Sequence, residues 1–475
     1  MDQSFQFTML VLEWLTTLFV FLLGLGILTI VVMFVVDVSQ TKHAVRRNYP
    51  VVGRFRGLFE KLGEFFRQYF FALDREEMPF NRAQRAWVYR AAKGVDETVA
   101  FGSTLNLSPP GTPIFVNCPY PMLEEEMHAP DPIRIGPFAR RPYDAPSFFN
   151  VSAMSYGALS KPAVLALSKG SRLAGNWLNT GEGGLAEWHL SGGCDIVFQI
   201  GTAKYGVRDE HGALNDERLK AIAGHDQVRM IELKLSQGAK PGKGGILPGA
   251  KVTEEIAEIR GIPAGQDSIS PNRHPEINSA ADLLDMLNHI REVTGLPVGF
   301  KAVIGAWSWL DELFTLINER GPESAPDFIT IDSGDGGTGA APIVLIDNVG
   351  LQIKESLPLV VDKLCYYGLR DRVRVIASGK LINPVDAAVA LCMGADLINS
   401  ARGFMFALGC IQALQCNKNT CPTGVTTHNK RLQRGLVPED KAERVARYSK
   451  SMRKEIGTIA HSCGVPNPSK LQRFH

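Results

Sequence analysis

Cysteine is scarce in this chain, with eight residues among 475. That density excludes a disulfide-stabilised scaffold. An excess of one charge is also missing, because 51 basic residues stand against 49 acidic ones and the formal net charge is +2. A general nucleic-acid-binding protein would carry a strong basic excess, so we expect no nucleic-acid partner. No Gly-x-Gly-x-x-Gly motif follows the first expected strand, which disfavours a Rossmann domain for a nicotinamide cofactor.

Charge is absent altogether from the 23 residues between Trp14 and Val36. A helix of that length rises ~34 Å, enough to cross a bilayer. A signal peptide is the alternative, but its apolar part would be shorter and would follow basic residues. The run is instead followed by a basic flank: Lys42, His43, Arg46, Arg47, Arg54, Arg56 and Lys61. The positive-inside rule then predicts a single-pass membrane protein with its N-terminus outside and the bulk of the protein in the cytoplasm.

The sequence divides into three parts. Residues 1–41 carry the apolar segment, and residues 42–149 form a basic, aromatic juxtamembrane segment followed by a Pro-rich lead-in. The juxtamembrane part reads either as an amphipathic segment on the membrane surface or as a packed helix with a solvated basic face. Residues 150–475 form the main domain.

From residue 150 onward, short apolar runs alternate with stretches of helical spacing. The expected strands are Phe149–Met154, Ile196–Ile200, Met230–Leu235, Val298–Val303, Phe328–Ile331, Val373–Ala377 and Ala395–Asn399. The expected helices are Lys161–Ala174, Ala280–Thr294, Trp307–Arg320, Gly350–Tyr367 and Pro384–Met393. This alternation is typical of an α/β fold with a parallel sheet, and the strand count favours a (β/α)8 TIM barrel over an open doubly wound sheet. Residues 236–278 lack apolar periodicity and are predicted to be a long loop at the barrel mouth.

Glycine-rich turns follow three successive expected strands. They contain Asp335-Gly336-Gly337, Ser378-Gly379 and Arg402-Gly403. Glycines let backbone N–H groups converge on an anion, and the late strands of a barrel are the usual place for a phosphate site. Arg402 adds a charge-assisted donor. The alternative is that the glycines only make tight turns, but three such turns in order favour a phosphate-bearing cofactor.

Polar residues mark the ends of other strands. They are Ser155, Gln199, Glu232, Lys234 and Lys301. Alternate residues of a strand share a face, so Glu232 and Lys234 are expected to point the same way. A lysine within an apolar strand, such as Lys301, is costly unless it faces a ligand or an anionic partner.

Three of the eight cysteines fall within twelve residues, as Cys410, Cys416 and Cys421. The spacing is compatible with an iron–sulfur cluster, with a zinc site or with no metal. Zinc normally takes four ligands, and no histidine lies inside the group. Three thiolates point to a cluster of the [3Fe-4S] type.

Five motifs resemble the FMN-binding synthase domain of glutamate synthase. They are VSAMSYGALS at 151–160, NTGEGG at 179–184, ELKLSQGAKPGKGGILPGAKV at 232–252, SGDGGTGAAP at 333–342 and LGCIQALQCNKNTCPTGV at 408–425. The resemblance implies a barrel that holds FMN beside a [3Fe-4S] cluster ligated by Cys410, Cys416 and Cys421. It also implies that 2-oxoglutarate and ammonia are converted to L-glutamate by hydride from the reduced flavin.

The resemblance also assigns residues by motif. Ala153, Met154, Ser155 and Gln199 are expected beside the flavin ring, and Lys301 near its N1/O2 edge. Gly336, Gly337, Ser378, Gly379 and Arg402 are expected to hold the phosphate, with Asp335 and Gly403 in the same loops. Lys234 and Gln237 are candidates to bind a substrate carboxylate and carbonyl, and Glu232 is a candidate proton donor.

The sequence departs from the family in three respects. The chain starts Met1-Asp2 with an apolar segment where the large enzymes carry an amidotransferase domain, so we expect free ammonia or a separate glutaminase as nitrogen source. The family's double-histidine segment reads Asn272-Arg273-His274-Pro275-Glu276, and one phosphate turn reads Ala-Ser-Gly-Lys.

These departures leave three hypotheses. The first is a membrane-anchored glutamate synthase-like enzyme that takes electrons from a ferredoxin-like protein or a membrane carrier. The second is a flavin dehydrogenase of an amino or hydroxy acid that passes electrons through the cluster. The third is a non-catalytic electron-transfer subunit.

Overall fold

A computed structural model describes residues 3–95 and 98–475 of the chain. Residues 1–2 and 96–97, which belong to the first and second predicted segments, lie outside the described residues. The chain divides into two compact units, Met1–Arg82 and Ala83–His475. Each unit is described by itself.

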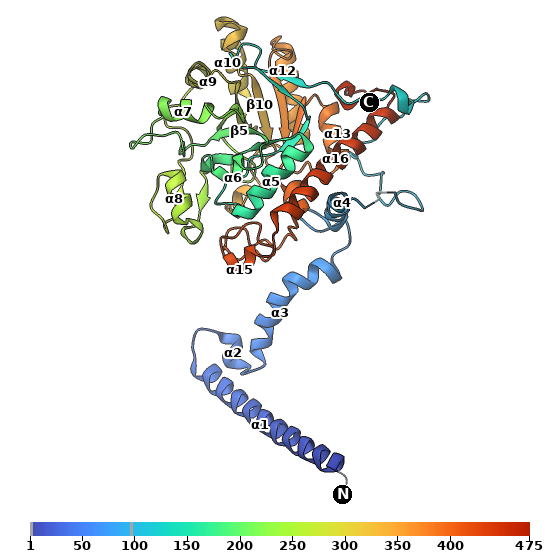
Figure 1. Ribbon diagram of the computed structural model, residues 1–475, viewed down its shortest axis with the longest axis vertical. Helices are drawn as coiled ribbons and strands as arrows, with labels where there is room; N and C mark the ends of the chain where they lie inside the picture. The colour runs from blue at the N-terminus through green and yellow to red at the C-terminus, as the bar shows by residue number, and fades with distance from the viewer. Residues whose placement is uncertain (1–2, 96–97) are drawn as a thin grey trace. The chain divides into compact units, whose positions relative to one another are not determined.

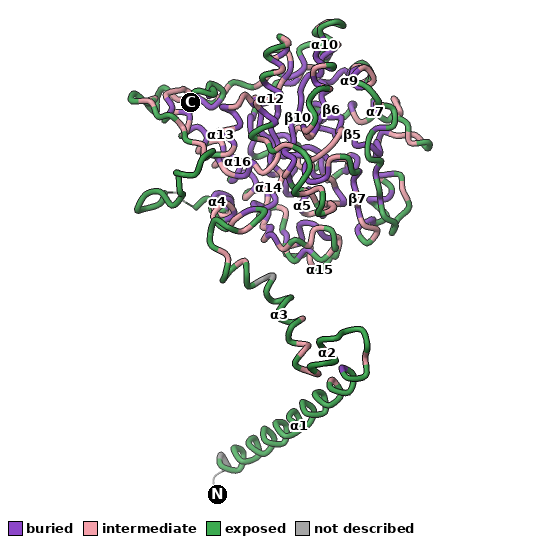
Figure 2. Tube along the Cα trace, turned by 180° about the vertical axis from the view of Figure 1, so that it is seen from behind, coloured by how far each residue is buried: buried purple, intermediate pink, exposed green. Residues whose placement is uncertain are grey.

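The first unit consists of helices. α1 (Gln3–Ser39) is longer than the charge-free run that predicted it, and its stretch Phe5–Ser39 is long and apolar enough to cross a membrane. Its residues from Phe5 onward are nearly all exposed (Figure 2). α2 (Ala44–Asn48), α3 (Gly53–Phe66) and a π-helical turn (Arg67–Phe71) follow. Asp37, near the end of α1, accepts hydrogen bonds from the Arg54 guanidinium at 2.8 Å and from the Val51 N–H at 3.0 Å, which fixes the start of α3 against α1.

The second unit is a closed barrel of eight parallel strands (Figure 1). In barrel order they are β3 (Phe149–Val151), β4 (Trp177–Asn179), β5 (Asp195–Ile200), β6 (Val228–Lys234), β9 (Val298–Val303), β10 (Phe328–Asp332), β11 (Arg374–Ser378) and β12 (Leu397–Ser400). β12 pairs with β3, which closes the cylinder. The TIM-barrel prediction is confirmed, and the open doubly wound alternative is excluded.

Helices surround the barrel (Figure 1). They are α5 (Lys161–Ala174), α6 (Glu187–Leu190), α7 (Asp216–Ala223), α9 (Ala280–Thr294), α10 (Ser308–Arg320), α11 (Ile343–Ile346), α12 (Ile353–Tyr366), α13 (Pro384–Cys392), α14 (Arg402–Leu408), α15 (Lys430–Gln433) and α16 (Pro438–Ser462). α4 (Arg82–Lys93) packs near the barrel unit's last helices through Trp87 on Tyr448. α5 shows why the predicted bounds were accurate: Ser160 caps its first turn and Gly175 ends it with a left-handed φ of 73°.

A short hairpin closes the amino-terminal end of the barrel. β1 (Ile133–Ile135) and β2 (Tyr143–Ala145) pair antiparallel within the predicted lead-in. Their buried side chains join a core made by the first halves of the barrel strands, which includes Trp177, Met230 and Phe328. Side chains fill this end of the barrel, and active sites of such barrels lie at the other end, where the strands' carboxyl termini are.

Several elements were absent from the expected set, among them α7, and other expectations were incomplete. β4 was missed because it is a three-residue strand, Trp-Leu-Asn, between turns. The 25-residue helix α16 was missed as well, although its buried face packs on α5. Residues 236–278 are not one structureless loop, because they contain β7 (Ile246–Leu247) paired with β8 (Ser268–Ile269), and α8 (Glu254–Arg260).

Candidate functional site

A cavity opens at the carboxyl ends of the barrel strands. Its empty space, including the open mouth, is about 1280 Å³. Most of the residues predicted to bind a cofactor line it, namely Ala153, Met154, Ser155, Gln199, Lys301, Gly337, Ser378, Gly379 and Arg402. They follow or end six strands far apart in sequence, and the barrel brings them together. The whole cavity, from its glycine loops to Cys416, belongs to the barrel unit.

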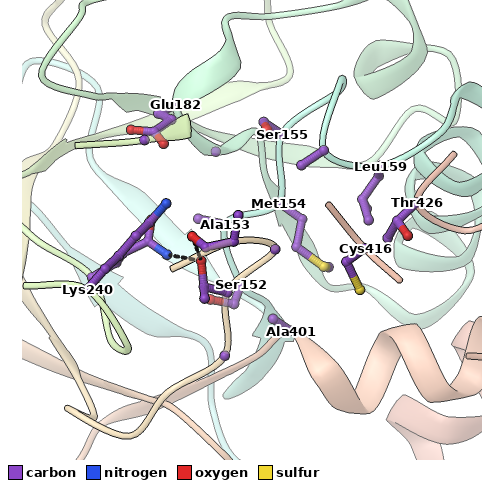
Figure 3. Close-up of a pocket in the computed structure, with 18 of the residues that line it drawn as sticks. Ser152, Ala153, Met154, Ser155, Leu159, Glu182, Lys240, Ala401, Cys416 and Thr426 are labelled. Atoms are coloured by element: carbon purple, nitrogen blue, oxygen red, sulfur yellow. Dashed lines mark hydrogen bonds between the residues drawn. The ribbon is translucent and has the colours of Figure 1, made fainter. Parts of the chain in front are cut away.

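One wall of the cavity is the segment that follows β3. Ser152, Ala153, Met154 and Ser155 run along it, while Glu182 and Lys240 lie at one end and Cys416 beyond Met154 (Figure 3). Ser152 Oγ lies 3.4 Å from Ser378 Oγ, so this wall meets the glycine turn after β11. The cavity bordered by this wall is termed the slot.

The glycine turns after β10 and β11 border the far side of the slot. Gly379 has a left-handed φ of 110°, and a Cβ on it would overlap Ser333. Gly339 also lines the cavity, and a Cβ there would meet no described atom within 4 Å. The turns therefore expose backbone to the cavity, which is what a bound phosphate requires.

Three residues predicted for the phosphate loops do not line the cavity. Asp335 forms an ion pair with Lys380 at 2.9 Å. Gly336 packs its backbone against Ser333, and Gly403 lies in α14 where a Cβ would overlap the Tyr448 hydroxyl. These residues shape the turns from behind, so direct contact with a ligand is not supported for them.

Arg402 lies between the glycine turns and the cysteine loop. Its guanidinium donates to the Thr338 carbonyl and lies 3.8 Å from the Cys416 sulfur. The predicted phosphate donor thus also contacts a predicted cluster ligand.

Lys301 is a buried cation in the barrel floor. Its Nζ lies 3.2 Å from Asp332 Oδ2. Burial by itself lowers the pKa of Lys301, but the carboxylates of Asp332 and Glu232 raise it above its ordinary value. The ammonium therefore stays charged beneath the slot, where it can face a developing anion.

Glu232 lies below the cavity rather than in its lining. Its carboxylate accepts hydrogen bonds from Asn179 at 2.8 Å, Gln199 at 2.7 Å and Thr330 at 2.6 Å. Through these contacts Glu232 positions the Gln199 side chain. Because Glu232 does not line the cavity, the structure does not support its predicted role as a direct proton donor.

The opposite end of the slot holds the predicted substrate residues. Lys234 Nζ lies 2.9 Å from Glu182 and 2.6 Å from the side-chain carbonyl of Gln237. Burial by itself raises the pKa of Glu182. The positive charges of Lys234, Lys240 and Arg260 outweigh this effect, so the pKa lies below its ordinary value and the carboxylate is ionised.

Sequence reasoning missed three residues at this end. Glu182 stands in the quoted NTGEGG motif, Lys240 in the loop after β6, and Arg260 at the end of α8, and all three line the cavity. Lys240 is buried, and its ammonium has no hydrogen-bond or ion-pair partner among residues 3–95 and 98–475. Burial and the neighbouring Lys234 charge lower the pKa of Lys240 to about 8. Lys240 could have been found from the sequence, because a lysine within a long Gly/Pro-rich loop is a candidate ligand-binding residue.

The cavity as a whole is strongly cationic. Only Glu182 and Asp332 carry acidic side chains in its described lining. The cationic lining residues are Lys234, Lys240, Lys251, Lys301, Lys380, Arg260 and Arg402. Such a lining favours anionic ligands.

The three predicted cluster ligands lie on one loop after α14. Cys410 and Cys421 are buried, and Cys416 is half-buried and lines the cavity. Gln412, Leu414 and Asn419 have left-handed backbone conformations, which curl the loop. Burial, and also the nearby Cys416 and Cys421 thiols, raise the pKa of Cys410 to about 11. Within the described ranges, no three His, Cys, Asp or Glu side chains are gathered closely enough to ligate one ion.

The profile of the conserved region in glutamate synthase matches residues 139–466. The chain is 40% identical over 500 residues to the glutamate synthase large subunit-like protein YerD of Bacillus subtilis, covering 96% of this chain and 94% of that protein. The chain belongs to the glutamate synthase family. The predicted resemblance is confirmed, and so is the prediction of an oxidoreductase enzyme at the level of the family.

Another relative is longer than this chain. The archaeal glutamate synthase [NADPH] of Methanocaldococcus jannaschii is 36% identical over 326 residues, covering 68% of this chain and 60% of that protein. Among solved structures, a lactate oxidase of Pediococcus acidilactici has a TM-score of 0.46 and 14% identity, covering 74% of this chain and 81% of that one. A TM-score at this level supports no inference about chemistry.

Proposed function

We propose that this glutamate synthase family member binds FMN in the barrel slot and reductively aminates 2-oxoglutarate with ammonia. The observation that carries the proposal is the cationic cavity with an unpartnered lysine among the described residues, Lys240, at one end. A buried cation without a partner is costly, and an anionic ligand would remove that cost. FMN carries one phosphate, and 2-oxoglutarate carries two carboxylates, so both suit this lining.

The residues present fit FMN. The glycine turns after β10 and β11 expose backbone at one edge of the slot, with Arg402 beside them. Ala153 and Met154 would contact the flat ring along the β3 wall, and Lys301 would stabilise negative charge on the ring from below. Bound FMN would supply the hydride that reduces the imine of 2-oxoglutarate.

The chain's own residues then bind and orient the oxo acid. Lys240 and Arg260 would bind the carboxylates, while Lys234 and Gln237 would hold the carbonyl end. After free ammonia attacks the carbonyl carbon, the positively charged nitrogen of the adduct must lose a proton, and Glu182, ionised beside Lys234, would accept it. Overall, 2-oxoglutarate, ammonium, two electrons and two protons give glutamate and water.

We propose that Cys410, Cys416 and Cys421 ligate a cluster, which requires the loop to draw the three sulfurs together, because the structure does not gather them around one ion. Arg402 approaches the Cys416 sulfur, and the Gln412 N–H donates to the Cys410 sulfur at 3.5 Å. Donors of this kind stabilise thiolates in iron–sulfur sites. Because Cys416 and Met154 both line the cavity, a [3Fe-4S] cluster here would lie at the edge of the flavin slot.

We further propose that α1 anchors the protein in a membrane. The support is its length, its apolar composition and its exposed surface. The Asp37–Arg54 contact holds α3 at the end of α1, and α3 exposes Phe55 and Phe59 beside basic residues, as an interfacial helix would. The test is extraction of the full chain from cell membranes, where retention at alkaline pH and release by detergent are expected. Release at alkaline pH alone would contradict an integral anchor.

The enzymatic proposal is tested with the full-length protein in detergent. The protein is reduced with an excess of reduced methyl viologen. 2-Oxoglutarate and ammonium are then added, and glutamate is quantified. Glutamate formation that disappears in Lys240→Met, with unchanged flavin content, is expected. Intact flavin and no glutamate would contradict the proposal. Bleaching of the oxidised flavin by an amino or hydroxy acid would instead favour a dehydrogenase.

A further inference from the structure

The Pro-rich lead-in to the barrel forms an exposed arm. Residues 98–131, termed the arm, contain one short 3-10 turn, Glu124–Glu126, and otherwise no helix or strand. Apolar side chains along the arm are more than half exposed, among them Phe101, Ile114, Tyr120 and Leu123. Phe101 also has a left-handed φ of 74°, which a bulky residue rarely adopts. Such a run of exposed apolar side chains marks a site of contact with another molecule.

Every charged residue of the arm is acidic. They are Glu124, Glu125, Glu126 and Asp131, and all four are exposed. None of the four forms an ion pair with another residue that the structure describes. An anionic lipid surface would repel such an arm, so the chemistry that fits it is a protein surface with positive charge.

The opposite pattern occurs between Cys410 and Pro438, where the chain has no acidic residue. Residues 411–437, termed the basic stretch, include α15 and carry four exposed cations that form no ion pair within the described ranges: Lys418, Lys430, Arg431 and Arg434. Leu414 and Val437, near the two ends of the stretch, are exposed apolar side chains. The chain thus carries two surfaces of opposite charge, although its net charge is only +2.

These two surfaces lie at opposite ends of α16. The basic stretch leads directly into the first residue of this helix. The arm is attached at the other end, where the Cys118 N–H donates to the Ser462 carbonyl at 2.8 Å and the His128 N–H reaches the Pro466 carbonyl. α16 has 25 residues and is therefore about 37 Å long, so the acidic turn of the arm and α15 are far apart within one copy (Figure 1).

We propose that two copies of this chain form a dimer in which the arm of each copy docks on the basic stretch of the other. A two-fold axis across the middle of α16 exchanges the two ends of the helix, so each dimer makes the contact twice. The charges steer the approach of the two copies, and the exposed apolar side chains of both surfaces make the contact. The inference does not depend on the proposed function, because the arm and the four cations lie outside the cavity lining.

The test is the protein mass per particle of the full-length chain in detergent, measured by light scattering over a series of protein concentrations. A dimer is expected, and its Kd should rise with salt because charges hold the two surfaces together. Lys430→Glu/Arg431→Glu should raise this Kd at least about tenfold at low salt, since like charges then face each other. Glu124→Lys/Glu125→Lys should have the same effect from the other surface.

Two further variants separate the pairing from a folding defect. A chain that carries both reversals has a basic arm and an acidic stretch, so it should dimerise again at low salt. Arg218→Glu/Lys354→Glu, which reverses two exposed cations on α7 and α12, should keep the wild-type Kd.

Three results would overturn the proposal. The first is a monomeric wild-type protein at every concentration; if Lys430→Glu/Arg431→Glu then also loses binding to phosphatidylserine vesicles, the basic stretch belongs to anionic lipid. The second is a dimer whose Kd neither reversal changes, which would assign association to another surface such as α1. The third is a chain with both reversals that stays monomeric, which would show that the two surfaces do not meet.

Discussion

Glu182 is held against the backbone of Gly245: a Cβ on Gly245 would overlap its Oε1 atom. Gly201 confines the same side chain from the other side, since a Cβ there would stand 2.5 Å from Glu182 Cβ. Between these two backbones, the Glu182 carboxylate lies 2.9 Å from Lys234 Nζ. Two glycines far apart in sequence fix the polar end of the slot.

Gly245→Ala is therefore expected to displace Glu182 from Lys234. Misplacement of a reacting group by about 1 Å can lower rates ~100-fold, so kcat/KM for 2-oxoglutarate should fall roughly 10–100-fold with flavin content unchanged. Steady-state kinetics and the flavin absorbance give the two readouts. Gly457→Ala in α16 is the matched control, because the nearest atom to its Cβ is 3.7 Å away. Full activity in Gly245→Ala would show that the position of Glu182 is not critical.

Lys240 predicts how oxo-acid binding depends on pH. Burial and the Lys234 charge lower its pKa from 10.5 to about 8. The cation is present below that pKa and lost above it, so affinity for 2-oxoglutarate should weaken as the pH rises through about 8. The effect on stability has the opposite sign. The unfolded chain holds this proton up to 10.5, so between pH 8 and 10.5 rising pH removes the cost of burying the charge.

The measurement is the Kd of 2-oxoglutarate from flavin absorbance changes between about pH 6.5 and 9.5, a window that brackets the lowered pKa. In Lys240→Met the weakening near pH 8 should disappear, and affinity should be low throughout. Lys354→Met, an exposed lysine on α12, should keep the wild-type profile. A wild-type affinity that is flat across this range would contradict the assignment of Lys240 to a substrate carboxylate.

The sequence predicted the barrel well because most of its strands are buried apolar runs followed by glycine turns. β9 and the helices α5 and α9 have the predicted bounds. β4 could not be found this way, because three residues give no period, and its place is fixed only by pairing with β3 and β5. α16 was overlooked although its apolar positions are helically spaced.

The candidate site was predicted in part for the same reason. Strand-end residues such as Lys301 and Ser378 converge because parallel strands end at one rim. Lys240 and Arg260 lie on the excursion between β6 and β9, whose path no local pattern specifies. Glu232 shows the converse limit. Its position on the strand was predicted correctly. Its carboxylate lies below the cavity, however, where it accepts hydrogen bonds from Asn179, Gln199 and Thr330.

Cys416→Ser tests the cluster assignment. A serine hydroxyl is a poor iron ligand, so iron content and the cluster's electron paramagnetic resonance signal should be lost while most of the flavin remains bound. Cys365→Ser is the control, because Cys365 is exposed on α12, away from the cysteine loop in sequence. Full retention of iron in Cys416→Ser would refute the ligand set.

Substitution of Asp327 is expected to lower the stability of the protein without changing its catalytic activity. It precedes β10 at the closed end of the barrel, fully buried, with Arg291 and Arg372 each at 2.9 Å. Asp327→Asn removes the charge that both guanidiniums share, and breaking such a buried pair costs about 3–5 kcal/mol. The melting temperature should fall by about 4–6 °C, with flavin content and kcat of the folded protein unchanged. Asp144→Asn breaks only the exposed pair with Arg134 and should cost under about 1 kcal/mol. Equal melting temperatures for the two variants would mean that solvent or rearrangement already compensates the buried cluster.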